Sequence, residues 1–385
     1  MKGNRRLLSP SESSVALAAL IGGAALFVVG AKFSVARAGA GLLLANFYFS
    51  SLALTALFFI AIQNVSSAGW PALFRRVPEA MTSYLPLGAA LTLLTALLAR
   101  DIYPWAVAGV AQTLGAGKAV YFSVGWFAAR AAVCWAVWLA YSRVLVGSSR
   151  AQDGAHGEAP RLPVAASATF LLAFGLTFSL AAVDWLMSLE PRWTSTLYPW
   201  FIFAGAFEGG LAAVTALVIV LRRRGFFSEL NENHLHDLGK YLFAFSCFWM
   251  YLWFCQYLLI WYTNIPDEAV HYMMRSSPAW SCLFWSNPVI NFIVPFGLLL
   301  PASRKKKEGV VLFAALLLLA GHALDLFMLI EPSQGPGPRL GLAEAAAFIA
   351  VGAAFLLLLD RSFASAAPEP ERDPFIEESR TFAGV

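Results

Sequence analysis

Charged residues are scarce in this chain, and their scarcity excludes a soluble globular protein. Asp, Glu, Lys and Arg together make up 13% of the 385 residues, whereas 59% are hydrophobic. Soluble domains carry about 25% charged residues and about 45–50% apolar ones. The formal net charge of +4 does not point to nucleic acid as a partner, because the positive residues fall in the loops between apolar segments.

Cysteine and histidine are also few, and their positions argue against several redox centres. The cysteines, Cys134, Cys247, Cys255 and Cys282, all fall within long apolar runs, and none belongs to a C-x-x-C pair. Disulfide scaffolds, thiolate metal sites and c-type haem attachment are therefore unsupported. A b-type haem in a helical bundle would need axial ligands, usually two histidines, and only His322 lies clearly within an apolar run. We expect no haem, metal or iron–sulfur cluster on this chain.

One local group of residues has the composition of a metal site. His234, His236 and Asp237 lie together in a polar loop, close to Asn231. A polar loop that caps the following helix explains these residues better than a metal site does.

Long apolar runs are what the sequence has in abundance. A membrane-spanning helix needs about 20 apolar residues, or about 17 at the short limit. Ten runs reach that length, with approximate bounds 14–31, 42–64, 81–99, 119–145, 163–186, 196–221, 239–263, 280–301, 309–330 and 341–359. The sequence therefore predicts an all-α polytopic membrane protein. Its transmembrane domain covers residues 1–363, and residues 364–385, rich in proline and mixed charge, form a disordered cytoplasmic tail.

The basic residues divide unevenly between the two sides of the predicted membrane domain. Nineteen Lys and Arg residues fall in the N-terminus, the even-numbered connections and the C-terminal tail, and seven fall in the odd-numbered connections. The positive-inside rule then places both termini in the cytoplasm.

Five ionisable residues interrupt the apolar runs, where a carboxylate costs at least ~2.5–3.5 kcal/mol to insert. At ~1.5 Å per helical residue, Arg130 lies about 16 Å and Glu208 about 18 Å from the outer ends of their spans, and His322 is near the same level. Asp325 follows His322 at i+3, so we expect the two to share a helix face and to point toward one partner. Asp184 and Asp325 lie in the outer third. The five residues thus form a band from the midplane outward.

Three interpretations of this band stay open. In the first, the acids and the imidazole form a proton path. In the second, the acids belong to a quinone-type site and accept protons from an oxidised quinol. In the third, the band is structural: Arg130 neutralises an acid, and polar groups hold helices together for ~0.6 kcal/mol apiece.

Four segments of the chain together resemble a known family. They are residues 118–130 (KAVYFSVGWFAAR), residues 184–196 (DWLMSLEPRWTST), residues 238–268 and residues 324–332 (LDLFMLIEP). The joint pattern is similar to that of the NrfD-like membrane subunits of bacterial alternative complex III, a quinol:cytochrome c oxidoreductase, and most of all to its quinone-binding ActF type. The resemblance covers about residues 40 to 332.

The resemblance implies a fold, a location and a set of partners. Helices two to five and six to nine would form two four-helix bundles, with flanking helices, in the bacterial inner membrane. The subunit would sit beside a sister NrfD-like subunit, an iron–sulfur subunit and c-type cytochrome subunits, which would carry the haem c and iron–sulfur clusters. This chain would have no redox cofactor of its own, and quinone or quinol is the small molecule it would meet.

The resemblance also implies that the chain conducts protons or supports a quinone site. Carried onto this sequence, the candidate residues are Arg130 and Asp184 in the first bundle and Glu208, Gln256, His322 and Asp325 in the second. Two departures weaken quinol binding in the first bundle. The family's Tyr-Leu-Asn after the lysine is replaced by Tyr-Phe-Ser at residues 121–123, and residues 103–105 have no histidine beside the tryptophan.

Two other functions remain as alternatives. A stand-alone secondary transporter would place its charged groups at broken helices near the midplane, and Pro199 and Pro288 are candidates for such breaks. A purely structural membrane anchor would carry out no chemistry at all.

The charge bias gives a prediction about orientation. With both termini in the cytoplasm, the connection containing Ser195 lies outside the cell. A Ser195→Cys variant should react with a membrane-impermeant thiol reagent in intact cells, with the unsubstituted chain as the control. Labelling that appears only after the membrane is opened would reverse the topology.

Overall fold

The computed structural model describes residues 6–153 and 163–384, and over these ranges it is helical, with no strand. Ten of its helices or helix groups are long and apolar enough to cross a membrane, and each corresponds to one of the ten predicted runs. The protein is an all-α polytopic membrane protein, as the sequence predicts. The spans are α1 (Pro10–Phe33), α2 (Val35–Val65), η1 to α4 (Ala72–Leu97), α7 (Val124–Asp153), α8 with η5 (Val164–Leu189), α9 (Tyr198–Arg223), α10 (Glu232–Thr263), α12 to α13 (Ser281–Leu299), α15 with η7 (Glu308–Ser333) and α16 (Leu342–Ala364).

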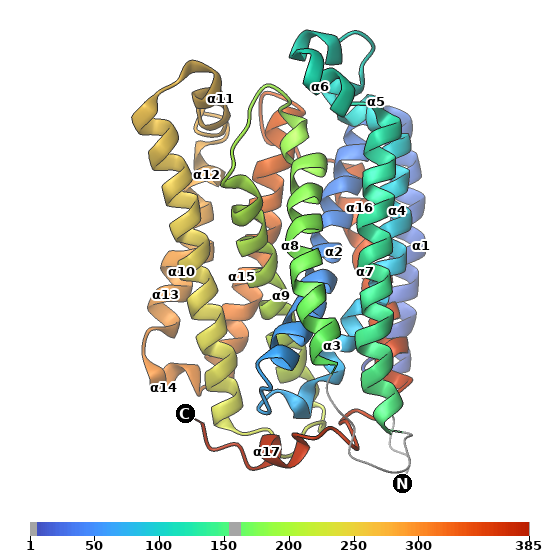
Figure 1. Cartoon of the computed structure of the whole chain (residues 1–385), viewed down its shortest axis with the longest axis vertical. Coiled ribbons are helices and arrows are strands. Elements are labelled where there is room, and N and C mark those ends of the chain that lie inside the picture. The colour runs from blue at the N-terminus through green and yellow to red at the C-terminus, as the bar shows by residue number, and fades with distance from the viewer. Residues whose placement is uncertain (1–5, 154–162, 385) are drawn as a thin grey trace.

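Short helices gather at the two ends of the long ones (Figure 1). We call one end the loop end; it carries α5 (Ala99–Ile102), η3 (Pro104–Ala106), η4 (Ala111–Leu114), α6 (Ala116–Tyr121) and α11 (Pro266–Arg275). We call the other the terminal end, because both chain termini lie there; it carries α14 (Ala302–Lys305) and α17 (Ile376–Arg380). The third span consists of η1 (Ala72–Phe74), α3 (Arg76–Met81), η2 (Thr82–Tyr84) and α4 (Leu85–Leu97), and the eighth of α12 (Ser281–Pro288), η6 (Val289–Ile293) and α13 (Val294–Leu299).

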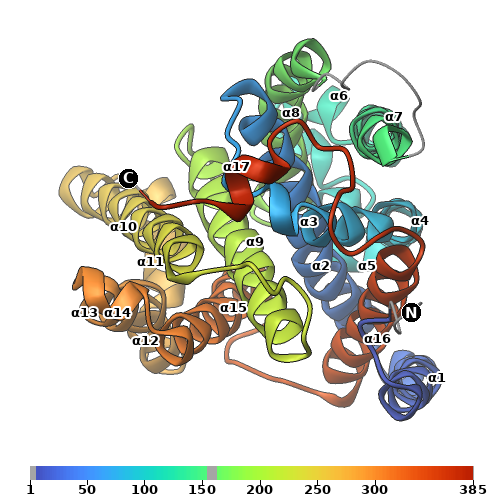
Figure 2. The ribbon, with the colours of Figure 1, turned by 90° about the horizontal axis from the view of Figure 1, so that it is seen from below.

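The long helices form two four-helix bundles that meet along one seam. In the first bundle, α2, α4, α7 and α8 contact one another in a ring; in the second, α9, α10, the α12–α13 span and α15 do the same. Figure 2 shows the two bundles side by side when the molecule is viewed from the terminal end. Helices α1 and α16 pair with each other, and α16 packs on the outside of α2. The expected division into helices two to five and six to nine is confirmed.

Helices α2 and α9 form the seam and are the most deeply buried spans, with 89% of the most apolar window of each enclosed by protein. They approach so closely that a Cβ added to Gly210 on α9 would lie 1.9 Å from Thr55 Oγ1 on α2. Thr55 Oγ1 also donates a hydrogen bond to the carbonyl of Ala206, at 3.2 Å. Lipid offers no hydrophobic drive for helix association, so close packing of small residues and hydrogen bonds of this kind hold spans together.

The C-terminal tail differs from the expected disordered segment. Its residue Asp373 forms an ion pair with Arg75 at the terminal end of the first bundle. Ser379 Oγ donates to the carbonyl of Trp70 at 2.7 Å and accepts from the amide of Leu73 at 3.1 Å. The tail thus crosses the terminal end of both bundles (Figure 2). Its polar groups find partners on the chain itself, which the tail's composition does not reveal.

The seam gives a prediction about stability. Gly210→Ala should lower the free energy of unfolding by about 1–3 kcal/mol, because overpacking a close contact forces the helices apart. Gly175→Ala on α8 is the matched control: no atom lies within 4 Å of the added Cβ, and alanine favours the helix. Thermal melting of the two purified variants in one detergent measures the difference. Equal melting temperatures would show that the α2–α9 contact does not limit stability.

Candidate functional site

Glu208 lies deep within the second bundle, as its depth in the sequence predicts. It is the eleventh residue of α9, which begins at Tyr198, so it is about 15 Å from the start of the helix. Its side chain is buried, with 2% of the residue exposed. Within the described part of the chain, no hydrogen-bond partner reaches its Oε1 atom.

Two glycines of α9 near Glu208, Gly205 and Gly209, allow polar side chains of α15 to pack directly against α9. A Cβ at Gly205 would lie 3.1 Å from Asp325 Oδ2, and a Cβ at Gly209 would lie 2.7 Å from His322 Cδ2. Glu208 occupies the same stretch of α9, three residues after Gly205 and one before Gly209. The structure therefore brings Glu208, His322 and Asp325 together around one stretch of α9.

His322 and Asp325 share the face of α15 that packs on α9, as expected, but they do not share a hydrogen-bond partner. Asp325 Oδ1 accepts from Asn287 Nδ2 at 2.7 Å, and its Oδ2 accepts from Trp249 Nε1 at 3.1 Å. His322 Nε2 instead meets Ser51 Oγ on α2 at 2.9 Å. Residues three apart on a helix diverge by about 60°, which here is enough to send one side chain into the second bundle and the other across the seam.

The eighth span adds polar groups that the sequence analysis did not single out. After Pro288 the helix continues as the π-helix η6, and Asn291 in this segment donates its Nδ2 to Asn287 Oδ1 at 2.6 Å. Ser246 Oγ on α10 donates to the carbonyl of Asn291 at 2.5 Å. A chain of hydrogen-bonded groups thus runs from Asp325 toward the terminal end. π-helical segments are frequent at functional sites, and the signal in the sequence is two asparagines four residues apart around Pro288.

The two candidate prolines have different effects. Pro288 interrupts the regular helix of the eighth span, as expected. Pro199 does not break the sixth span: it lies in the first turn of α9, which starts at Tyr198. Proline is well suited to that position because the first turn needs no amide donor.

In the first bundle, Arg130 and Asp184 form a closed ion pair. Arg130 Nε lies 2.6 Å from Asp184 Oδ2, and Nη2 lies 3.1 Å from Oδ1. Tyr121 donates its hydroxyl to Oδ1 at 2.7 Å. Both carboxylate oxygens therefore have donors, which agrees with the structural interpretation of this pair.

The expected depth of Arg130 is wrong. Helix α7 begins at Val124, so Arg130 lies six residues, or about 9 Å, from the start of the helix, not near the midplane. The physical reason is that residues 116–121 form the separate helix α6 and do not extend α7.

At the loop end, Glu190 and two residues of α11, His271 and Arg275, form a largely buried charged cluster that the sequence analysis missed. Glu190 Oε1 accepts from Arg275 Nη2 at 2.7 Å, and its Oε2 lies 3.0 Å from His271 Nδ1. The ring of His271 stacks on Trp193 with 3.9 Å between centroids. Arg275 also donates to the carbonyls of residues 328 and 329 at the end of α15, at 2.9 and 3.1 Å. The cluster thus ties α11 to both bundles.

The protonation states of this cluster follow from burial and from Arg275. Burial favours the neutral carboxyl, but Arg275 and His271 outweigh it and lower the pKa of Glu190 to about 2. Burial, and then the neighbouring Arg275, lower the pKa of His271 to about 4. At neutral pH the cluster therefore holds a charged carboxylate, a charged guanidinium and a neutral imidazole.

The polar loop before α10 is a helix cap, as predicted. Asn231 Oδ1 accepts from the amides of Asn233 and His234, at 2.9 and 3.4 Å, and His234 Nδ1 lies 3.1 Å from the same oxygen. Over residues 6–153 and 163–384, no three His, Cys, Asp or Glu side chains gather as metal ligands would.

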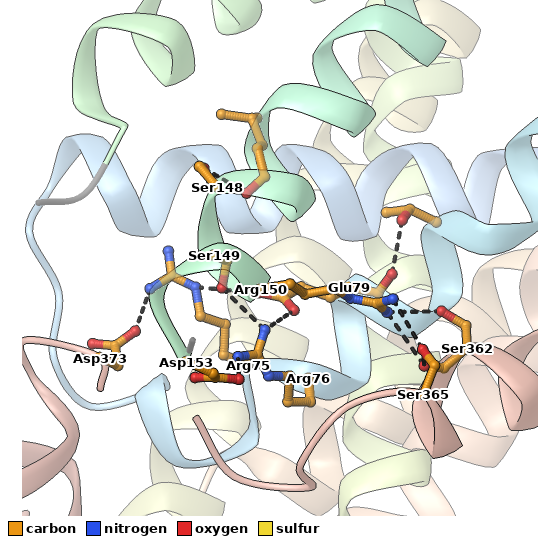
Figure 3. Close-up of polar contacts among 12 residues, drawn as sticks. Arg75, Arg76, Glu79, Ser148, Ser149, Arg150, Asp153, Ser362, Ser365 and Asp373 are labelled. Atoms are coloured by element: carbon orange, nitrogen blue, oxygen red, sulfur yellow. Dashed lines mark hydrogen bonds and ion pairs between the residues drawn. The ribbon is translucent and has the colours of Figure 1, made fainter. Parts of the chain in front are cut away.

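The terminal end of the first bundle holds a second buried charged cluster (Figure 3). Arg76 Nη1 lies 2.5 Å from Glu79 Oε2, and its Nη2 lies 2.5 Å from Asp153 Oδ2. Arg76 and Glu79 are buried, with 2% and 0% exposed. In the sequence, Arg75 and Arg76 count only among the basic loop residues that set the orientation of the chain in the membrane. The structure shows that they also join the third span to α7 and to the tail.

Comparison with known proteins gives no further guide: no protein-family model and no curated protein matches this sequence.

The loop-end cluster gives a prediction about pH. His271 has a pKa of about 4, against its usual value of 6.5, so on acidification the unfolded chain binds this proton first. Its contribution to stability is therefore complete above about pH 6.5 and is lost as the pH falls toward 4, by at most about 3 kcal/mol. His271→Gln should remove that part of the pH dependence. Melting temperatures in detergent between pH 7 and pH 4 measure it, with His236→Gln at the terminal end as the control. Identical pH profiles for the two variants would contradict the assignment.

Proposed function

We propose that this chain is an NrfD-like membrane subunit of a quinol-oxidising respiratory complex and that it conducts protons through its second bundle. The observation that carries the proposal is Glu208, a carboxyl in the middle of α9 that is 2% exposed and has an oxygen without a partner among the described residues. An acid in a membrane span is costly. An acid retained without a counter-ion is suited to gaining and losing a proton.

The residues around Glu208 support a proton route of several groups, of which Glu208 is one. Asp325 is held by neutral donors, Asn287 and Trp249, so its charge can change without breaking an ion pair. Asn291 extends the hydrogen-bonded chain toward the terminal end. His322 contributes an imidazole at the seam, with a Ser51 hydroxyl as its partner. In this proposal protons pass between Glu208 and Asp325, and the buried Arg130–Asp184 pair holds the first bundle together.

The placement of the subunit follows from the same proposal. It lies in the bacterial inner membrane with both termini in the cytoplasm, beside a sister NrfD-like subunit. Iron–sulfur and c-type cytochrome subunits carry the electrons. The four matching segments and the two-bundle fold support this placement.

One observation favours a second candidate, a stand-alone secondary transporter. Pro288 and the π-helix interrupt the eighth span beside the polar chain, and transporters build their sites at interrupted helices. Purification in a mild detergent separates the two functions. A transporter is recovered alone, whereas a subunit of the complex brings haem absorbance from its partner chains.

The proposal predicts the effect of removing one titratable proton. Glu208→Gln keeps the shape and the hydrogen-bonding capacity of the side chain, so the complex should assemble normally. Turnover or proton translocation per electron should fall, with turnover slowing by about 100-fold if Glu208 is an obligatory proton carrier. Proton uptake and electron transfer by the assembled complex in vesicles measure both quantities.

Two further variants separate chemistry from structure. Glu308→Gln makes the same change in a partly exposed ion pair at the terminal end and should leave both quantities unchanged. Glu208→Leu tests packing and should disturb assembly if the acid is structural. A normal proton-to-electron ratio and normal turnover in assembled Glu208→Gln complex would refute the proton route.

A further inference from the structure

A cleft of about 550 Å³ opens between the two bundles at the loop end. One wall is the end of α8, another is the segment at residues 194–199 that leads into α9, and the third is formed by α10 and α11. This volume lies within the roughly 300–1,000 Å³ typical of pockets for small molecules. None of the proton-route residues proposed above lines the cleft, so the chemistry of its own walls has to identify the occupant.

Gln256 on α10 presents an unused hydrogen-bond donor to the cleft. The residue is buried, with 3% exposed, and its Nε2 has no hydrogen-bond partner in the described part of the chain. A buried donor without a partner destabilises the protein, and a bound acceptor removes that cost. The occupant therefore brings an oxygen atom to the depth of Gln256.

Glu268, in the first turn of α11, supplies the only charge on the described walls of the cleft. No Lys or Arg lines the cleft, and among the described residues no cation forms an ion pair with this carboxylate. A carboxylate in this position attracts a cationic group and repels an anionic one. The charge of the walls therefore favours an occupant with a positive group and no net negative charge.

The position of the cleft in the membrane sets the order of the groups on its occupant. Gln256 lies seven residues before Thr263, the last residue of α10, so it is about 10 Å inside the end of the span. Glu268 follows the end of that span. Leu259, on the rim of the cleft, is 58% exposed on a helix that crosses the membrane. The occupant thus has its cation at the membrane surface, an oxygen atom deeper, and an apolar part that passes Leu259 into the bilayer.

Hydroxyl groups line the cleft in the segment that leads into α9. They belong to Thr194, Ser195 and Thr196, and each can donate a hydrogen bond to a phosphate oxygen. A lipid with a phosphate and no ammonium would place its negative charge beside Glu268 with no lining cation to bind it. A lipid whose head group carries an ammonium next to the phosphate satisfies both the hydroxyls and the carboxylate.

We propose that this cleft binds the head group of phosphatidylethanolamine, a zwitterionic phospholipid with a primary ammonium. The ammonium donates to the carboxylate of Glu268, the hydroxyls of residues 194–196 donate to the phosphate, and Gln256 Nε2 donates to an ester carbonyl. The acyl chains leave past Leu259. Phosphatidylcholine fits less well, because its trimethylammonium group has no N–H to donate. The lipid fills the gap between the two bundles, and its binding does not depend on the proposed function.

The test compares phospholipids that differ only in their head group. Purified full-length protein is stripped of lipid in a mild detergent and titrated with phosphatidylethanolamine, phosphatidylcholine or phosphatidylglycerol of the same acyl chains. Native mass spectrometry counts the lipid bound to each chain. We expect one phosphatidylethanolamine per chain, bound at least tenfold more tightly than either of the other lipids, and a higher melting temperature when it is bound.

Two substitutions test the contacts separately. Glu268→Gln should abolish the preference for phosphatidylethanolamine over phosphatidylcholine. Gln256→Leu should weaken phosphatidylethanolamine at least tenfold but keep that preference, because both lipids carry the same ester carbonyls. The matched controls are Asp267→Asn, in the adjacent exposed acid that does not line the cleft, and Gln63→Leu, in a buried glutamine that donates to Tyr241 Oη at 3.2 Å. Both controls should bind lipid as the unsubstituted chain does.

Melting temperatures without added lipid show whether each variant is folded. Equal affinity for the three lipids, or an undiminished preference in folded Glu268→Gln, would overturn the proposal. Tighter binding of phosphatidylglycerol would overturn it as well and assign the cleft to an anionic lipid. Phosphoethanolamine without acyl chains is titrated in the same way, and binding as tight as that of the full lipid would show that the ligand comes from water and not from the membrane.

Discussion

Helices α2 and α9 lie in such close contact that Gly210 leaves no room for a Cβ against Thr55, and the arrangement of the remaining helices follows from that contact. Each of the two helices is the inner wall of one bundle. Because they touch along their length, α15 can rest on α9 and still reach α2, where His322 meets Ser51. Lipid provides no hydrophobic drive for association. The polar groups at this seam therefore specify the packing as well as any chemistry.

The buried acids of this protein fall into groups that differ in how their charge is balanced. Asp184, Glu190 and Glu79 each lie against an arginine. Protonating the acid of such a pair leaves the arginine as an uncompensated buried charge, which is strongly destabilising. These acids are therefore suited to fixed structural roles. Asp325 accepts from two neutral donors, and Glu208 has an oxygen without any donor among the described residues. These two can change protonation without dismantling an ion pair, and they lie in the same bundle.

The membrane makes some of this architecture predictable and leaves the rest to packing. Every span must satisfy its own backbone and be apolar over about 20 residues, so the ten helices and the depth of Glu208 can be obtained from the sequence. The depth of Arg130 cannot, because a break before Val124 depends on how α6 folds back. The cluster of Glu190 and His271 joins segments about 80 residues apart. No local pattern encodes such a contact, and the same is true of the tail, whose partners lie on other elements.

Helix α10 carries two buried polar side chains of the second bundle at different depths. Trp249 donates to Asp325, and Gln256 lies seven residues further along the same helix, or about 10 Å along its axis. The rings of Trp249, Trp253 and Tyr257 follow one another along this helix, with centroids 6.4 and 5.6 Å apart. Trp249 belongs both to this aromatic row and to the hydrogen bonds of Asp325. Because α10 supplies this donor, a shift of α10 would change how the charge of Asp325 is stabilised.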